Sequence, residues 1–92
     1  MSTRLSGKQV ELMLDAIESG YDRGDLRALT RIELNEELDS IAGGETMRDL
    51  GLSLISWAEQ TGRVHDLVAA LVRRNPTNPQ VQTLAGESKT WF

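Results

Sequence analysis

Apolar residues recur every three or four positions along most of the chain, which is the period of an α-helix. No segment alternates between apolar and polar residues in the way that is typical of a strand. The first helix is predicted at about residues 7–19, because Ser6 and Gln9 have the spacing of a capping box and Gly20 suits a left-handed C-cap. Its apolar stripe consists of Val10, Met13, Leu14 and Ile17.

The stretch between Asp25 and Ala42 changes helical phase part-way along its length. At about 100° of rotation per residue, its apolar residues fall on two opposite sides, and one straight helix cannot bury both. Asn35 is a good N-cap residue, so we predict one helix at about residues 25–33 and a second at about 36–42. The first apolar set is Leu26, Leu29 and Ile32, and the second is Leu34, Leu38 and Ile41.

Three more helices are predicted from the residues at their ends. The first runs from Thr46 to Gly62 and is apolar over a wide arc, which is typical of a central helix. The next begins near Val64 and has two arginines in its last turn, where the helix dipole favours cations. The last begins at Asn78, which is followed by a proline, and we assign the residues from Gly86 onward to a tail.

Six short helices with short connections predict an all-α fold, a compact antiparallel six-helix bundle. The 92 residues are enough for one domain with one hydrophobic core. We assign residues 1–86 to that domain and residues 87–92 to a tail or the start of a linker. The predicted core consists of Met13, Leu14, Ile17, Leu29, Leu38, Ile41, Leu50, Leu54, Trp57, Leu67, Leu71 and Leu84.

The composition excludes several kinds of functional site. The chain has no cysteine, so it has no disulfide, thiolate metal site or cysteine nucleophile. Its single histidine, His65, is too few for a multi-histidine metal site. Gly43 and Gly44 precede a helix, but Glu45 occupies the position where a phosphate-binding loop carries lysine. We therefore expect no enzymatic activity, no cofactor and no metal.

Charge and hydropathy indicate the kind of partner. A net charge of −4 argues against nucleic acid, whose binding requires clustered lysine and arginine. No apolar run approaches the ~20 residues of a membrane span, and the N-terminal residues lack the pattern of a signal peptide. We expect a cytoplasmic module whose partner is a protein.

The charges are divided unevenly along the chain. Residues 1–50 contain six basic and eleven acidic side chains, whereas residues 51–92 contain four basic and three acidic ones. A solvated mosaic of surface charge is one interpretation. The other is a docking module with two unlike surfaces, because opposed charges steer encounter and set specificity. The candidate interaction residues are Glu36, Glu37 and Asp39 on the acidic surface and Arg73 and Arg74 on the basic surface.

Four segments resemble the bacterial effector-associated domain of the first type. They are LSGKQVE at residues 5–11, LDSIAGG at 38–44, WAEQTGR at 57–63 and NPTNP at 75–79, and they cover about residues 5–86 in the right order. The resemblance implies a six-helix, death-like bundle, usually fused to effectors such as peptidases, TIR domains or signalling NTPases of bacterial conflict systems. It also implies homotypic or paired docking with like or related effector-associated domains, which brings an effector to its activator.

Two positions depart from the pattern of that family. Asn35 stands where glycine is usual, although asparagine still suits a helix start. Gly51 lies inside a predicted helix where a larger apolar residue is usual, at a cost of about 1 kcal/mol in helix propensity. This glycine indicates either close packing or a less stable helix.

A second class of function fits the same residues. A small, antitoxin-like regulator would bind and inhibit one protein target without homotypic docking. An effector encoded in frame after residue 92 would favour docking, and a stop codon beside a toxin gene would favour inhibition. In the docking case we expect weak self-association of an isolated copy, because exposed ion pairs contribute about 0–1 kcal/mol each.

Overall fold

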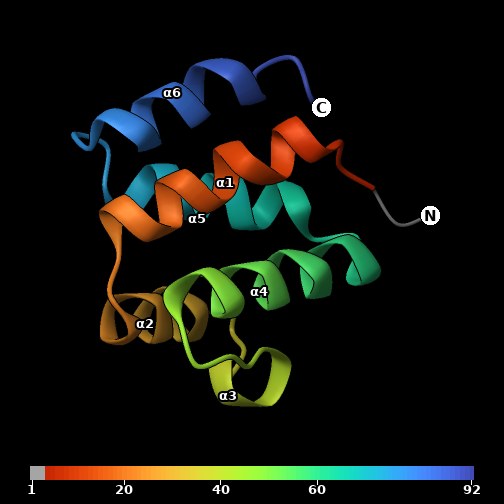
Figure 1. Ribbon diagram of the computed structural model, residues 1–92, viewed down its shortest axis with the longest axis vertical. Coiled ribbons are helices and arrows are strands. Elements are labelled where there is room, and N and C mark those ends of the chain that lie inside the picture. The colour runs from red at the N-terminus through yellow and green to blue at the C-terminus, as the bar shows by residue number, and fades with distance from the viewer. Residues whose placement is uncertain (1–3) are drawn as a thin grey trace.

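Six α-helices make up most of residues 4–92, the part of the chain that the computed structural model describes (Figure 1). This part contains no strand, so the all-α, six-helix fold expected from the sequence is confirmed. In chain order the helices are α1 (Gly7–Gly20), α2 (Arg23–Glu33), α3 (Leu38–Ile41), α4 (Met47–Thr61), α5 (Val64–Arg74) and α6 (Pro79–Ser88).

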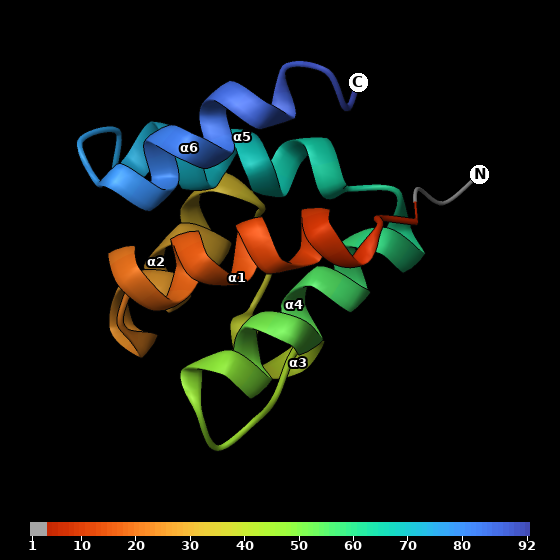
Figure 2. The ribbon, with the colours of Figure 1, turned by 45° about the horizontal axis from the view of Figure 1, so that its top comes forward.

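Helices α1, α4, α5 and α6 alternate in direction across the bundle. In Figure 1, α1 and α5 cross the view in one direction, and α4 and α6 cross it in the other. Helix α1 packs against both α4 and α6, and α5 packs against the same two helices. The short α3 lies at one end of the bundle beside α2 and α4 (Figures 1 and 2). Helix α2 contacts both α3 and α5.

Local capping groups determine the ends of several helices. The Ser6 hydroxyl oxygen accepts from the Gln9 backbone N–H at 3.2 Å, and the Gln9 side chain accepts from the Ser6 N–H at 2.8 Å. Thr46 accepts from a backbone N–H at the start of α4, and Gly62 ends that helix with a left-handed φ of 71°. Asn78 accepts from two backbone N–H groups of α6. These predicted caps are confirmed.

The end of α1 differs from the prediction. Gly20 is the last residue inside the helix rather than a left-handed C-cap, and the C-cap is Tyr21, which is extended with a φ of −138°. A Cβ at Gly20 would lie 2.9 Å from Nδ2 of Asn75, and that amide donates to the Gly20 carbonyl at 2.8 Å. Glycine therefore accommodates the close approach of the Asn75 side chain, and it is not used here for a left-handed backbone conformation.

The predicted break between α2 and α3 is confirmed, but Asn35 has a different role. It follows α2 in the left-handed region, with a φ of 57°, and it is not the N-cap of α3. The Thr30 carbonyl accepts from the N–H groups of both Leu34 and Glu36, so the chain reverses direction at Asn35. Asparagine adopts this conformation more readily than most residues. Because the reversal uses these residues, α3 is shorter than the predicted 36–42.

Helix α6 continues past Gly86 and ends at Ser88. A Cβ at Gly86 would meet nothing within 4 Å, and the backbone there is helical, so this glycine does not stop the helix. The Ser88 hydroxyl donates to the Ala85 carbonyl at 3.3 Å, and the Ser88 side chain is buried. The prediction of a tail from Gly86 onward is therefore wrong for residues 86–88. Beyond the helix, Trp91 packs partly buried against the core.

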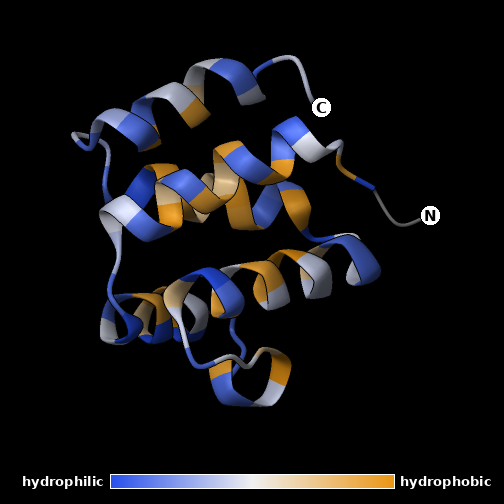
Figure 3. Ribbon diagram, in the orientation of Figure 1, coloured by the Kyte–Doolittle hydropathy of each residue, from blue (hydrophilic) through white to orange (hydrophobic). Residues whose placement is uncertain are grey.

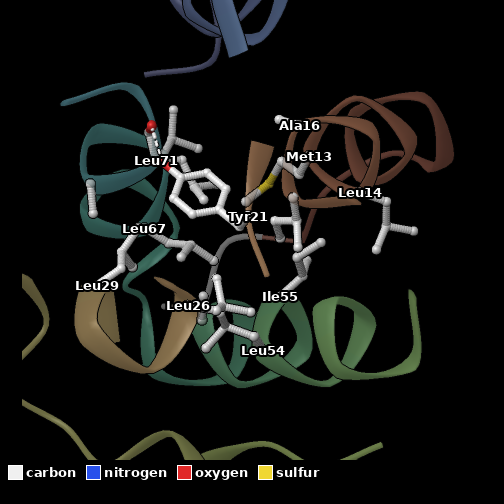
Figure 4. Close-up of a cluster of buried hydrophobic side chains, with 14 of the residues drawn as sticks. Met13, Leu14, Ala16, Tyr21, Leu26, Leu29, Leu54, Ile55, Leu67 and Leu71 are labelled. Carbon is white, nitrogen blue, oxygen red and sulfur yellow. Dashed lines mark hydrogen bonds between the residues drawn. The ribbon is translucent and has the colours of Figure 1, made fainter. Parts of the chain in front are cut away.

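The buried residues form one core, and the hydrophobic segments of α1, α4 and α5 face one another around it (Figures 3 and 4). All of the predicted core residues are buried except Ile41 and Trp57, which lie partly buried at its margin. The Trp57 ring lies under the guanidinium group of Arg63, with 5.5 Å between Cζ and the ring centroid. The other buried apolar residues are Leu5, Ala16, Tyr21, Leu26, Leu34, Ile55, Ala58, Val64, Val68, Ala70 and Val81.

A buried hydrogen bond joins the end of α1 to the end of α5. The Tyr21 hydroxyl donates to the Leu71 carbonyl at 2.5 Å (Figure 4). Leu71 lies in the last turn of α5, where carbonyl groups have no partner within the helix. Burial raises the pKa of Tyr21 to about 12, because the charged phenolate would lose its hydration. Tyr21 therefore supplies the missing donor at this helix end.

Two further glycines lie where another part of the chain comes close. A Cβ at Gly51 would lie 2.9 Å from Cδ2 of Leu14, so α4 approaches α1 closely at this point. Close packing therefore explains Gly51. Gly44 has a φ of 151°, and a Cβ there would lie 2.6 Å from Cβ of Asp49. Gly44 and its neighbour Gly43 form the turn that leads into α4.

Candidate docking surfaces

The predicted acidic surface is partly neutralised by arginines of α2. Glu37 pairs with Arg31 at 3.4 Å, and Asp39 pairs with Arg27 at 3.2 Å. The four-residue spacing of the two arginines places them on the side of α2 that faces α3. Glu36 is partly buried and forms no ion pair with the other residues that the structure describes. The surface is therefore a mixture of both charges with a small acidic excess.

The predicted basic surface lies at the end of α5, where its two arginines share one carboxylate. Arg73 pairs with one oxygen of Glu33, and Nη1 of Arg74 lies 3.7 Å from the other. The Glu33 side chain is only 14% exposed, so it is largely shielded from solvent. One carboxylate cannot neutralise two cations, and an excess of positive charge remains at this corner.

The acidic and the basic interaction residues predicted from the sequence both form ion pairs with side chains of α2. Arg27 and Arg31 of this helix pair with α3, and Glu33 of the same helix pairs with α5. The sequence predicts two separate charged elements, whereas the structure provides both with counter-ions from one helix. Exposed ion pairs contribute only about 0–1 kcal/mol, so these charges can still exchange partners. Their role in docking stays a prediction.

A further ion-pair cluster joins α1 to α4. Arg48 of α4 donates to Glu11 at 2.5 Å and to Glu18 at 3.0 Å, and both glutamates lie on α1. These hydrogen bonds raise the pKa of Arg48 above its ordinary value. The cluster supports the close α1–α4 contact, and because two carboxylates share one guanidinium group, one negative charge remains in excess there.

The structure contains an apolar groove between α5 and α6, with a volume of about 710 Å³. We call it the α5–α6 groove. Val68, Ala69 and Val72 contribute apolar surface from α5, and Ala85 contributes it from α6. Cationic and polar side chains line the rest of it, namely His65, Arg73, Ser88 and Lys89. An apolar centre with a polar edge is the usual composition of a protein–protein contact.

Phe92 lies at one end of this groove. Its ring packs against the His65 ring with 4.7 Å between the centroids, yet 54% of Phe92 is exposed. His65 is thus a surface residue that supports an aromatic side chain. The Trp91 and Phe92 rings also meet edge to face, with 6.3 Å between their centroids.

Ile32 is the most exposed large hydrophobic side chain among residues 4–92, at 64%. The sequence groups it with Leu26 and Leu29 in one apolar stripe, but the structure buries those two leucines and leaves Ile32 outside. Leu52 of α4, at 41%, is also exposed, whereas its helical neighbour Ile55 is buried.

Sequence reasoning did not find the α5–α6 groove. The available signals were an apolar arc on α5 that is wider than one stripe, through Val68, Ala69 and Val72, and the two aromatic residues at the end of the chain. The same signals are typical of core residues, and Val68 is indeed buried in the core. The packing of α6 leaves Ala69 and Val72 only partly buried, and that cannot be read from the local pattern.

The described residues include no group of three or more histidine, cysteine, aspartate or glutamate side chains that could hold a metal ion. No helix within residues 4–92 is both long enough and apolar enough to cross a membrane.

A family model described as effector-associated domain 1 matches residues 3–89. That range is almost the whole of the 92-residue chain. The chain belongs to the effector-associated domain 1 family. Membership supports a role as an accessory domain of effector proteins. Neither the curated proteins nor the solved structures include a match.

In this effector-associated domain, the segments that carry the resemblance mainly determine the fold. Ser6, Gly44, Gly62 and Asn78 are cap or turn residues, and residues 73 and 74 lie outside these segments. The family match ends at residue 89, one residue beyond the end of α6. The match thus agrees with the longer α6 of the structure.

Proposed function

We propose that this effector-associated domain is a non-enzymatic adaptor. It docks with a like or related effector-associated domain and so brings an effector to its activator in bacterial conflict signalling. We place this role in the cytoplasm. The observation that carries the proposal is the open apolar groove on α5 and α6, which no segment of residues 4–92 fills. A concave, mostly apolar surface with a few polar groups at its edge is the usual form of a binding site.

Incompletely paired charges on two parts of the surface support docking between unlike surfaces. Arg73 and Arg74 share one carboxylate, and Glu36 has no cationic partner among the described residues. Excess positive charge on one surface and excess negative charge on another steer two copies into a defined orientation. Such pairs contribute little affinity, so two linked copies should bind much more strongly than one.

The test is interferometry with immobilised single copies and tandem-linked copies in solution, at low and high salt. A second sensor carries a related effector-associated domain from the same genome. We expect binding to at least one sensor, and we expect it to weaken as salt screens the charges. Absence of binding to both sensors at low salt would contradict the adaptor role.

The arginine surface needs a matched control because its residues also form an intramolecular pair. Arg73→Glu/Arg74→Glu reverses the surface charge but leaves Glu33 among like charges. Arg73→Glu/Glu33→Arg restores an ion pair of opposite orientation at the same place. We expect both variants to bind less than wild type. Binding that survives both variants and high salt would exclude this surface, even if docking itself were confirmed.

The absence of catalysis is tested separately. Native mass spectrometry after gentle purification should give only the mass of the polypeptide. A bound nucleotide or a stoichiometric metal ion would contradict the non-enzymatic part of the proposal.

A further inference from the structure

We propose that the α5–α6 groove receives Ile32 of a second copy of this domain. The inference rests on the proposed docking function and names the two surfaces that meet. Ile32 would insert between α5 and α6 of the partner copy, and carboxylates beside it would meet the cationic edge of the groove.

The groove has the chemistry to receive an aliphatic side chain flanked by negative charge. Its floor is made by small and branched apolar side chains, Val68, Ala69, Val72 and Ala85. Lys89 lines the groove and forms no ion pair with any other residue of the described part of the chain. The groove lining includes no acidic residue. A matching ligand is therefore apolar at its centre and anionic at its edges.

Ile32 lies on α2 in surroundings of that kind. Positions 25, 28 and 32 follow one another along the same side of the helix, so Asp25 and Ala28 share the side of Ile32. Glu36 follows three residues after the end of the helix. Neither Asp25 nor Glu36 forms an ion pair within residues 4–92, and Arg31 beside Ile32 is already paired with Glu37.

The other exposed apolar side chains fit the groove less well. Leu52 is 41% exposed, against 64% for Ile32, so it offers less apolar surface for insertion. Phe92 is itself part of the groove. Among the exposed large hydrophobic residues of the described chain, Ile32 is the most exposed, and Asp25 and Glu36 of the same region form no ion pair.

The test uses two complementary variants. Ile32→Asp removes the inserting side chain and keeps the groove, and Ala69→Arg fills the groove and keeps Ile32. Each is measured by interferometry as an immobilised single copy against tandem-linked copies, so that avidity makes a weak contact measurable. We expect each variant to bind itself at least about tenfold more weakly than wild type, and Ile32→Asp to bind Ala69→Arg, because that pair retains one intact contact.

Controls separate the contact from folding. Leu52→Asp and Ser56→Arg place the same side chains on exposed positions of α4 and should bind like wild type. Lys89→Glu, at an exposed position, should weaken binding, and Glu36→Lys on the opposite copy should restore it. Thermal melting of every variant confirms that the domain is folded.

The outcomes distinguish the contact from the function. The contact would be overturned if Ile32→Asp and Ala69→Arg each bound themselves as strongly as wild type does. It would also be overturned if the two variants failed to bind each other. Either result would leave the docking function standing. Binding to a related domain without any self-binding would overturn the second copy as occupant. Binding to neither would contradict the docking function itself.

Discussion

Arg73 and Glu33 are forty residues apart in the sequence, and their side chains form an ion pair between the last turns of α5 and α2. Glu33 also lies 3.7 Å from Arg74, so one largely buried carboxylate serves both arginines. The arginines therefore have a structural role in addition to any role in docking. Their substitution must be interpreted with both roles in view.

The Arg73–Glu33 pair should contribute measurably to stability. In a double-mutant cycle with Arg73→Ala and Glu33→Ala, we expect a coupling energy of about 0.5–1 kcal/mol, because Glu33 is shielded from solvent more than most surface carboxylates. Urea unfolding of the four proteins gives the value. A coupling energy of zero would show that Arg73 is free for a partner at no cost.

Tyr21→Phe should lower the free energy of unfolding by about 1–2 kcal/mol, because the buried Leu71 carbonyl loses its hydrogen-bond donor. Chemical denaturation monitored by circular dichroism measures the effect. Tyr21 is the only tyrosine in the chain, so no second phenol complicates the comparison. An unchanged midpoint would mean that water or another group replaces the hydroxyl.

The same tyrosine should make stability depend on pH in the alkaline range. Its pKa is about 12 in the folded domain and 10.0 when unperturbed, so the unfolded chain releases the proton first. The contribution of Tyr21 to the free energy of unfolding is fully present below about pH 10 and is lost progressively as pH rises toward about 12. Unfolding free energies of wild type should converge on those of Tyr21→Phe over this interval. Parallel curves for the two proteins would contradict the burial of the phenol.

Gly51→Ala and Gly86→Ala form a matched pair of helix substitutions. At Gly86 the new methyl group meets open space, so the gain in helix propensity should stabilise the domain by about 0.5–1 kcal/mol. At Gly51 it meets Leu14 at 2.9 Å, so overpacking should make this variant less stable than Gly86→Ala by about 1–3 kcal/mol. Thermal unfolding of both variants decides this, and equal stabilisation would mean that Leu14 moves aside freely.

The parts of the fold that could be predicted from the sequence depend on local interactions. Ser6 with Gln9, Thr46 and Gly62 act within one or two helical turns, and their capping roles follow from residue type and spacing. The phase change near Asn35 predicted a break for the same reason. The conformation at the break was not predictable, because it depends on two N–H groups that share the Thr30 carbonyl.

The candidate surfaces were less predictable because they depend on which helices meet. The acidic and basic residues were visible in the sequence, but their counter-ions were not, since the packing of α2 brings Arg27 to Asp39 and Glu33 to Arg73. The α5–α6 groove arises because α6 leaves part of α5 uncovered. Nothing in the local pattern around Val72 distinguishes that partly buried surface from a fully buried one.

The docking role is tested most directly by light scattering from tandem-linked copies of the domain. The weight-average mass is measured against concentration at about 50 mM and about 500 mM salt, where screening differs severalfold. For wild type we predict a mass above that of one tandem molecule at low salt, and a mass close to that of one tandem molecule at high salt. For the Arg73→Glu/Arg74→Glu variant we predict a mass close to that of one tandem molecule already at low salt. A mass of one tandem molecule under every condition, together with no binding to a related effector-associated domain, would contradict the account.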